Sequence, residues 1–101
     1  MSSLLADTKA LADLVEPNKL AAEGFLRPQS VFVVPGTDHT GDDAFYVYLV
    51  YPDETAEENL AWNAVKPMVR WVRSAIREAT GEERWAYVRV LRSVDLPSGL
   101  R

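Results

Sequence analysis

A polar loop between two predicted strands holds the residues that could support acid–base or metal chemistry. Residues 36–43 read Gly-Thr-Asp-His-Thr-Gly-Asp-Asp and include the only histidine of the chain. An imidazole among carboxylates could bind a divalent cation or transfer protons. The candidate residues are Asp38, His39, Asp42 and Asp43. Their spacing does not match a calcium-binding loop, and an exposed hairpin connection, which commonly uses Gly, Asp and Thr, is the simpler interpretation.

The rest of the sequence lacks the motifs of familiar catalytic sites. It has no phosphate-binding glycine loop, no Gly-x-Ser-x-Gly, no His-Glu-x-x-His and no dinucleotide fingerprint. The absence of cysteine excludes disulfides, thiolate metal ligands and a cysteine nucleophile. We therefore assign no catalytic residue and expect no cofactor. A small enzyme or metal-binding protein that uses the polar loop is the alternative function.

Four basic residues recur at helical spacing after a tryptophan. The set comprises Trp62, Lys66, Arg70, Arg73 and Arg77. Steps of four, three and four residues place the cations on one helix face, which we expect to lie opposite the apolar stripe. Arginine suits contacts with phosphates and carboxylates. The pattern predicts an electrostatic surface for an acidic protein or, as a third function, a nucleic acid. A solvated helix face is the simpler interpretation.

Charge is distributed unevenly along the chain, whose formal net charge is −4. Residues 28–65 contain seven acidic residues and no Lys or Arg, whereas residues 66–92 contain seven basic and three acidic residues. This distribution predicts one acidic and one basic patch. The net negative charge argues against nucleic acid or an anionic membrane as a partner of the whole surface.

The elements that position these residues begin with two helical pieces. Apolar residues recur at helical spacing in residues 3–24. Pro17 cannot occupy a helix interior, so the first piece is predicted to end near Val15 and the second to run from Pro17 to Glu23. Gly24 is a suitable terminator.

Three strands are predicted. They cover Ser30–Val34, ended by Pro35 and Gly36, then Ala44–Tyr51, and finally Arg84–Val94. The first two should pair as an antiparallel hairpin over an eight-residue loop. The second and third flank a helix, so they should run parallel. The sequence leaves open whether the third strand lies beside the second or the first.

A long helix is predicted between the second and third strands. Thr55 and Glu58 match a capping box, and the helix should run to about Ala79 and close at Thr80–Gly81. Pro67 should kink it or split it near residues 63–66. The predicted apolar stripe is Ala61, Ala64, Val65, Met68, Val72, Ala75, Ile76 and Ala79.

These elements predict an α+β fold of the order α-β-β-α-β. It is a two-layer sandwich in which helices cover one face of a three-stranded mixed sheet. Residues 1–101 should form one domain, with residues 95–101 as a loose C-terminal tail.

The far face of this sheet is predicted to carry surplus aromatic residues. If Phe45, Val47 and Leu49 face the helices, their neighbours face away, and no third layer is expected to cover them. The predicted interface residues are Tyr46, Tyr48, Trp85, Tyr87 and Leu91. A large uncovered apolar patch usually marks an interface. Two alternatives remain: a terminal segment could cover the face, or the rings and Arg89 could stack nucleic-acid bases, although no RNA-binding motif is present.

The sequence thus predicts a small, acidic, cytoplasmic interaction module that binds itself or another protein through this aromatic face. No apolar stretch approaches the roughly 20 residues that span a bilayer. The N-terminus lacks the pattern of a signal peptide, because Asp7, Lys9 and Asp13 interrupt it.

Overall fold

The computed structural model describes residues 4–80 and 85–100. Its first two helices are α1, Leu4–Leu14, and α2, Pro17–Ala22. Pro17 occupies the first turn of α2, where its missing N–H leaves no helical hydrogen bond unmade. Gly24 has a φ of 89°, a left-handed conformation that ends the helix. The predicted division at Pro17 and termination at Gly24 are both confirmed.

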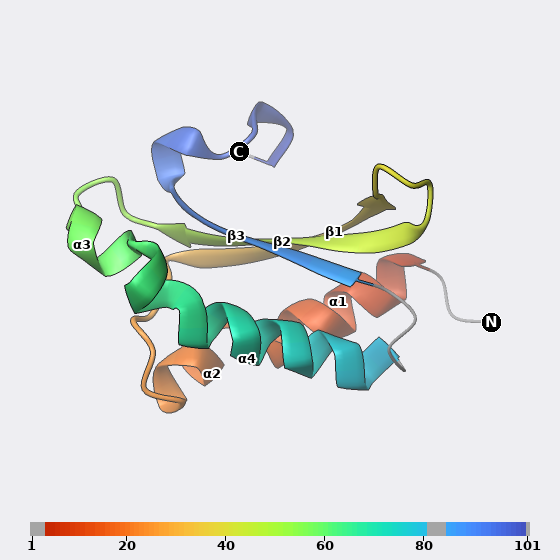
Figure 1. Ribbon diagram of the computed structural model, residues 1–101, viewed down its shortest axis with the longest axis horizontal. Helices are drawn as coiled ribbons and strands as arrows, with labels where there is room; N and C mark the ends of the chain where they lie inside the picture. The colour runs from red at the N-terminus through yellow and green to blue at the C-terminus, as the bar shows by residue number, and fades with distance from the viewer. Residues whose placement is uncertain (1–3, 81–84, 101) are drawn as a thin grey trace.

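The sheet has three strands in the order β1-β2-β3. They are β1, Ser30–Thr37, β2, Asp43–Tyr51, and β3, Trp85–Arg92. β1 pairs antiparallel with β2, and β2 pairs parallel with β3. Helices lie on one side of this sheet (Figure 1). The predicted two-layer α+β fold is confirmed, and the structure places the third strand beside the second.

The first hairpin is longer and its loop shorter than predicted. β1 continues through Pro35 and Gly36 to Thr37, where the sequence pattern had suggested an end at Val34. β1 is an edge strand, the position in a sheet where proline is tolerated. The loop is therefore confined to residues 38–42.

The predicted long helix is two helices, α3, Glu57–Leu60, and α4, Trp62–Thr80. The break falls at Ala61, whose extended backbone (ψ 150°) lets its carbonyl accept hydrogen bonds from the N–H groups of Ala64 and Val65. Pro67 lies inside α4, so the predicted break near residues 63–66 was too late. The predicted capping box is also wrong: the residue before α3 is Ala56, and no side chain caps the helix.

Two boundaries of these elements cannot be compared with the prediction. Gly81, expected to close α4, and Arg84, expected to begin β3, lie outside the described residues. In the described part of the chain, no helix is both long enough and apolar enough to cross a membrane.

The core lies between the sheet and the helices. Phe45, Val47 and Leu49 are fully buried there, as predicted. The buried stripe of α4 comprises Val65, Met68, Val69, Val72 and Ile76. It includes Val69, which the prediction omitted, while Ala61, Ala64 and Ala79 are exposed.

Because the buried stripe differs from the predicted one, the cations of α4 also lie elsewhere relative to it. Each of Lys66, Arg70, Arg73 and Arg77 directly follows a buried residue of α4, and consecutive residues differ by about 100° around a helix. The basic face therefore flanks the apolar stripe. The prediction that it lies opposite was wrong.

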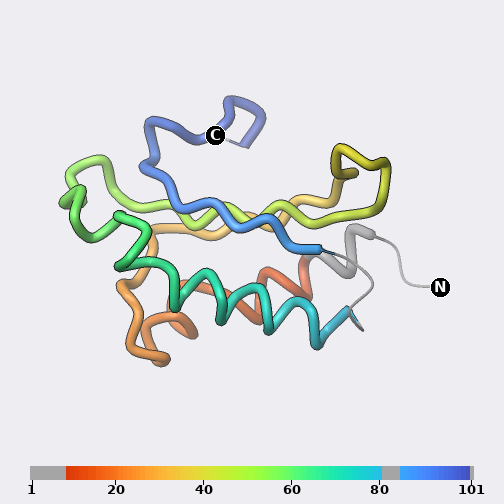
Figure 2. The backbone as a smooth tube through the Cα atoms, in the orientation of Figure 1, coloured from red at the N-terminus to blue at the C-terminus, as the bar shows by residue number. Residues whose placement is uncertain are grey.

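The C-terminal segment forms two short turns, Ser93–Asp95 and Ser98–Leu100. In Figure 2, this segment and the hairpin loop both rise on the side of the sheet away from α1 and α4. Leu96 is buried, with 6% of its surface exposed. The looseness of the tail stays a prediction, but its path contradicts the expectation that nothing covers the far face.

Candidate functional site

The far face of the sheet is ordered by strand register. Tyr46 lies beside Tyr87, Tyr48 beside Arg89, and Val50 beside Leu91. Because side chains alternate along a strand, these residues point away from the helices that cover Phe45 and Val47. We call this surface the aromatic face and define it by Tyr46, Tyr48, Trp85, Tyr87, Arg89 and Leu91. Its predicted orientation agrees with the structure.

The C-terminal segment covers only one end of the aromatic face. At that end Val50 is 1% exposed, although neither it nor Leu96 belongs to the helix-side core. At the other end Trp85 remains 47% exposed, while Tyr46, Tyr48 and Tyr87 are half-buried. A terminal segment therefore covers the aromatic face near Val50, as one alternative had predicted. The cluster of aromatic rings stays accessible.

The rings of the aromatic face contact one another. Tyr46 and Tyr87 stack with centroids 5.3 Å apart and planes 17° apart. Trp85 meets Tyr87 edge-on at 6.5 Å. Both arrangements are favourable for aromatic pairs. The cluster therefore presents a preformed surface whose rings lose little conformational freedom on binding.

Gly36 allows the Tyr46 ring to lie flat across β1. The Tyr46 hydroxyl donates a hydrogen bond to the Thr37 carbonyl oxygen at 2.8 Å. A Cβ at Gly36 would stand 2.8 Å from Cε2 of Tyr46, closer than carbon atoms approach. Glycine at this position therefore sets the orientation of the first ring in the cluster.

Replacing Gly36 with alanine should displace the Tyr46 ring. We expect a loss of about 1–2 kcal/mol in the free energy of unfolding, the usual cost of overpacking, and a change in the ring-current shifts of Tyr87. Denaturant unfolding and NMR would measure these effects. Gly99→Ala is the matched control, because an added Cβ meets no atom within 4 Å there. Unchanged Tyr46 and Tyr87 resonances in Gly36→Ala would contradict the expectation.

Arg73 joins the basic face of α4 to the aromatic face. Its Nε donates a hydrogen bond to the Ala86 carbonyl oxygen at 3.2 Å, on the free edge of β3. Its guanidinium carbon lies 4.7 Å from the centroid of the Trp85 ring, a cation–π contact. The sequence predicted two separate surfaces. In the structure, the Arg73 side chain connects the basic face of α4 with the aromatic face.

A groove opens over the cluster, with a cavity volume of about 410 Å³. Its lining comprises Tyr46, Tyr48, Arg73, Tyr87, Val88 and Arg89, and we call it the aromatic groove. This volume lies within the range of small-ligand and side-chain pockets. A smaller hollow of about 200 Å³ continues it along Tyr48, Arg89 and Asp95.

Comparison with known proteins identifies no relative that would indicate what this groove binds. No protein-family model matches this chain, and no curated protein is significantly similar to it in sequence. The chemistry of the aromatic groove must therefore be inferred from its own residues: aromatic rings and hydroxyls along the sheet, and two guanidinium groups beside them.

The polar loop is organised by Asp38. Its Oδ1 accepts hydrogen bonds from the Thr40 N–H at 2.8 Å, the Thr40 hydroxyl at 2.5 Å and the Asp42 N–H at 3.1 Å. The Thr40 hydroxyl contributes most to holding the pKa of Asp38 below its usual value. These contacts are typical of a side chain that closes a turn.

The predicted metal ligands do not gather into a site. Asp38, His39, Asp42 and Asp43 lie on or beside the same loop, and in the described part of the chain no group of three or more His, Cys, Asp or Glu is placed to hold a metal ion. One charge of this loop, on Asp38, nevertheless affects a residue of the aromatic face, Tyr87. Burial first, then the charge of Asp38 and the neighbouring Tyr46, raise the pKa of Tyr87.

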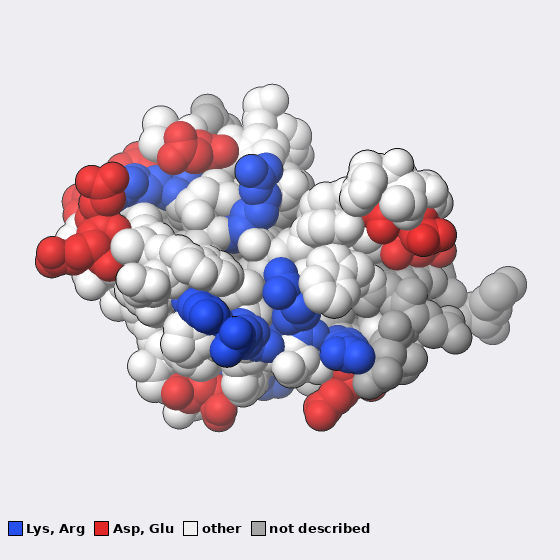
Figure 3. Space-filling view, in the orientation of Figure 1, with Lys and Arg blue, Asp and Glu red and all other residues white. Residues whose placement is uncertain are grey.

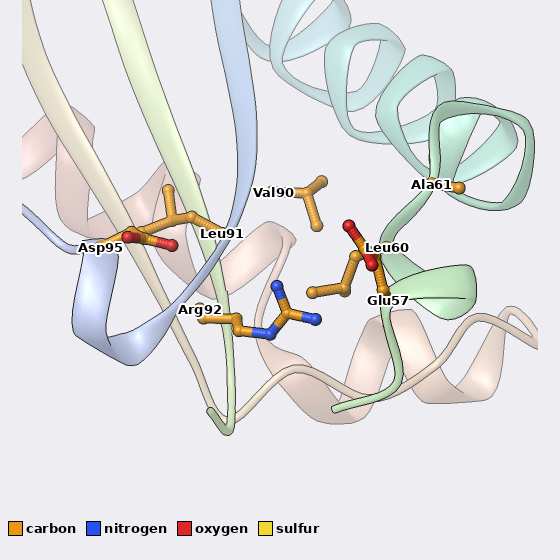
Figure 4. A pocket seen from close by; sticks show the side chains of 7 residues that line it. All are labelled: Glu57, Leu60, Ala61, Val90, Leu91, Arg92 and Asp95. Atoms are coloured by element: carbon orange, nitrogen blue, oxygen red, sulfur yellow. The ribbon is translucent and has the colours of Figure 1, made fainter. Parts of the chain in front are cut away.

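A second cavity, of about 330 Å³, lies where α3 meets the end of β3. Arg92 and Glu57 extend into it from opposite sides (Figure 4). The Arg92 Nη2 donates a hydrogen bond to the Thr55 carbonyl oxygen at 2.9 Å, and Asp53 accepts one from the Val94 N–H at 2.8 Å. These bonds attach the loop before α3 to the end of β3. This cavity was not predicted, because the residues that line it come from two segments far apart along the chain.

The other residues of the predicted electrostatic surface belong to α4. Trp62 is 58% exposed, Arg70 and Arg77 are exposed, and Lys66 is half-buried. In Figure 3, basic side chains gather across the middle of the molecule, with acidic side chains toward both ends. The predicted single acidic patch is therefore divided in two, because the polar loop and the α3 region lie at opposite ends of the sheet.

Proposed function

We propose that the protein is a small interaction module that binds another protein chain, a second copy or a different partner, through the aromatic face. The observation that carries the proposal is the preformed cluster of Trp85, Tyr87 and Tyr46 beside the aromatic groove, in which Trp85 is exposed and the two tyrosines are half-buried. Tyr, Trp and Arg are the residue types that dominate binding energy at protein interfaces. Rings that already contact one another suit this role, because less side-chain entropy is lost on association.

Truncation of Trp85 tests the proposal. In a preparation from native expression, we expect sedimentation velocity to show the chain in a complex, either as a homodimer or with a co-purified protein. Trp85→Ala should weaken that association by about 2 kcal/mol, roughly thirtyfold, as expected for an exposed aromatic residue that anchors an interface.

Trp62→Ala is the matched control, since Trp62 is also exposed but lies at the start of α4, away from the aromatic face. It should leave the complex intact. A wild-type chain that sediments as a monomer with nothing bound would contradict the proposal. So would an equal effect of the two substitutions.

A further inference from the structure

The aromatic groove is lined by two cations, Arg73 and Arg89. Within residues 4–80 and 85–100, neither Arg73 nor Arg89 forms an ion pair. Arg73 is fixed by the Ala86 carbonyl and the Trp85 ring, neither of which neutralises its charge. Arg89 is exposed and faces the groove beside Tyr48. In a chain with a formal net charge of −4, these guanidinium groups are available to an anionic ligand.

Contact of the aromatic face with its own copy is unfavourable. A twofold dimer brings the same patch together from both subunits, so residues at its centre meet their equivalents. Arg73 and Arg89 would then face arginines, while carboxylates border both ends, Asp38 near Tyr87 and Asp95 beside Arg89. Like charges would meet at the centre and at the ends, and such pairings oppose association.

The carboxylates of Asp38 and Asp95 also limit the length of an anionic ligand that can bind in the aromatic groove. Basic side chains gather in the middle of the view in Figure 3, and acidic side chains lie toward its left and right ends as well as along its lower edge. A nucleic-acid strand that followed the cations would pass over Asp38 or Asp95. A segment that carries only a few negative charges would not.

We infer that the aromatic groove binds a short acidic peptide segment of a different protein. Carboxylates of that segment pair with Arg73 and Arg89, and an aromatic or aliphatic side chain between them packs on Tyr46 and Tyr87. Arginine pairs with carboxylates through two parallel hydrogen bonds, and the stacked tyrosines offer a flat apolar surface beside the cations. This inference rests on the proposed function and specifies the partner.

Peptide titration followed by NMR tests the inference on the full chain. The probe is a blocked peptide with two glutamates on each side of a phenylalanine, and the comparison peptide carries glutamines in their place. We expect the acidic peptide to shift the amides of Tyr87 and Arg89 and the indole of Trp85. Its affinity should fall as salt rises from roughly 20 to 200 mM, because exposed charges are screened.

Arg89→Glu should weaken binding of the acidic peptide by at least about tenfold, since like charges would then face each other. This variant should fold, because Arg89 is exposed and makes no side-chain hydrogen bond within the described residues. Arg27→Gln is the control: Arg27 binds Asn18 of α2 at 2.9 Å, away from the groove, so affinity should change less than about twofold.

Three outcomes would overturn the inference: binding of neither peptide, equal binding of the glutamine peptide, or tighter binding of a short oligothymidylate. The proposed function fails separately. If the peptides do not bind but Trp85→Ala still dissociates the complex, the aromatic face is an interface, and its partner is not an acidic peptide segment. If Trp85→Ala also has no effect, both proposals are wrong.

Discussion

Phe45→Ala is expected to lower the free energy of unfolding by about 3–5 kcal/mol, the usual cost of truncating a buried phenylalanine. Phe45 is fully buried on the helix side of the central strand, within the same core as Val47, Val72 and Ile76. The loss combines transfer of the ring to water with the cavity it leaves behind. Urea denaturation, followed by circular dichroism, would measure it.

Phe32→Ala provides the matched control on the opposite face of the sheet. Phe32 lies beside Tyr48 in the register and is half-buried. Its truncation should cost roughly half as much as that of Phe45, because less apolar surface is returned to water. Equal losses for the two variants would mean that the two sides of the sheet are equally enclosed, contrary to the structure.

Raising the pH from about 10 to about 12 should destabilise the protein by roughly 2 kcal/mol through Tyr51. Burial raises the pKa of Tyr51 to about 12, and its hydroxyl donates a hydrogen bond to the Leu26 carbonyl oxygen at 2.7 Å. In the unfolded chain a tyrosine ionises near pH 10. The unfolded state therefore loses its proton first, and stability falls with rising pH until the folded state ionises too.

Tyr51→Phe isolates this effect. At neutral pH the variant should be less stable by about 1–2 kcal/mol, because the Leu26 carbonyl loses its donor. Between pH 10 and 12 it should lose much less stability than the wild type. Chemical denaturation at several pH values would give both slopes. Parallel slopes would show that Tyr51 does not ionise late in the folded state.

Local patterns predicted the elements and the two sides of the sheet. Alternation along β2 separates Phe45 from Tyr46, and Pro17 divides the first helical segment as expected. These features depend on residues close together in the sequence, where backbone geometry alone decides the result.

Features that depend on distant residues were not predictable in this way. Val69 is buried because of the way α4 is rotated about its axis against the sheet. The same rotation places Arg73 at the edge of β3, where it contacts Trp85. Likewise, the C-terminal segment lies on the side of the sheet away from the helices (Figure 1), and no local sequence pattern predicted this path. The aromatic residues of the candidate site were therefore predicted, but the groove formed with Arg73 and Arg89 was not.

The bond between Arg73 and Ala86 also affects how the molecule avoids aggregation. An edge strand invites a foreign strand to add to the sheet, and proteins usually block that addition with charges or proline. On β3, Arg73 occupies the carbonyl acceptor of Ala86; on β1, Pro35 has no N–H to donate. Each edge strand thus has one position that cannot pair with an added strand, whereas the broad surface of the sheet remains open to contact.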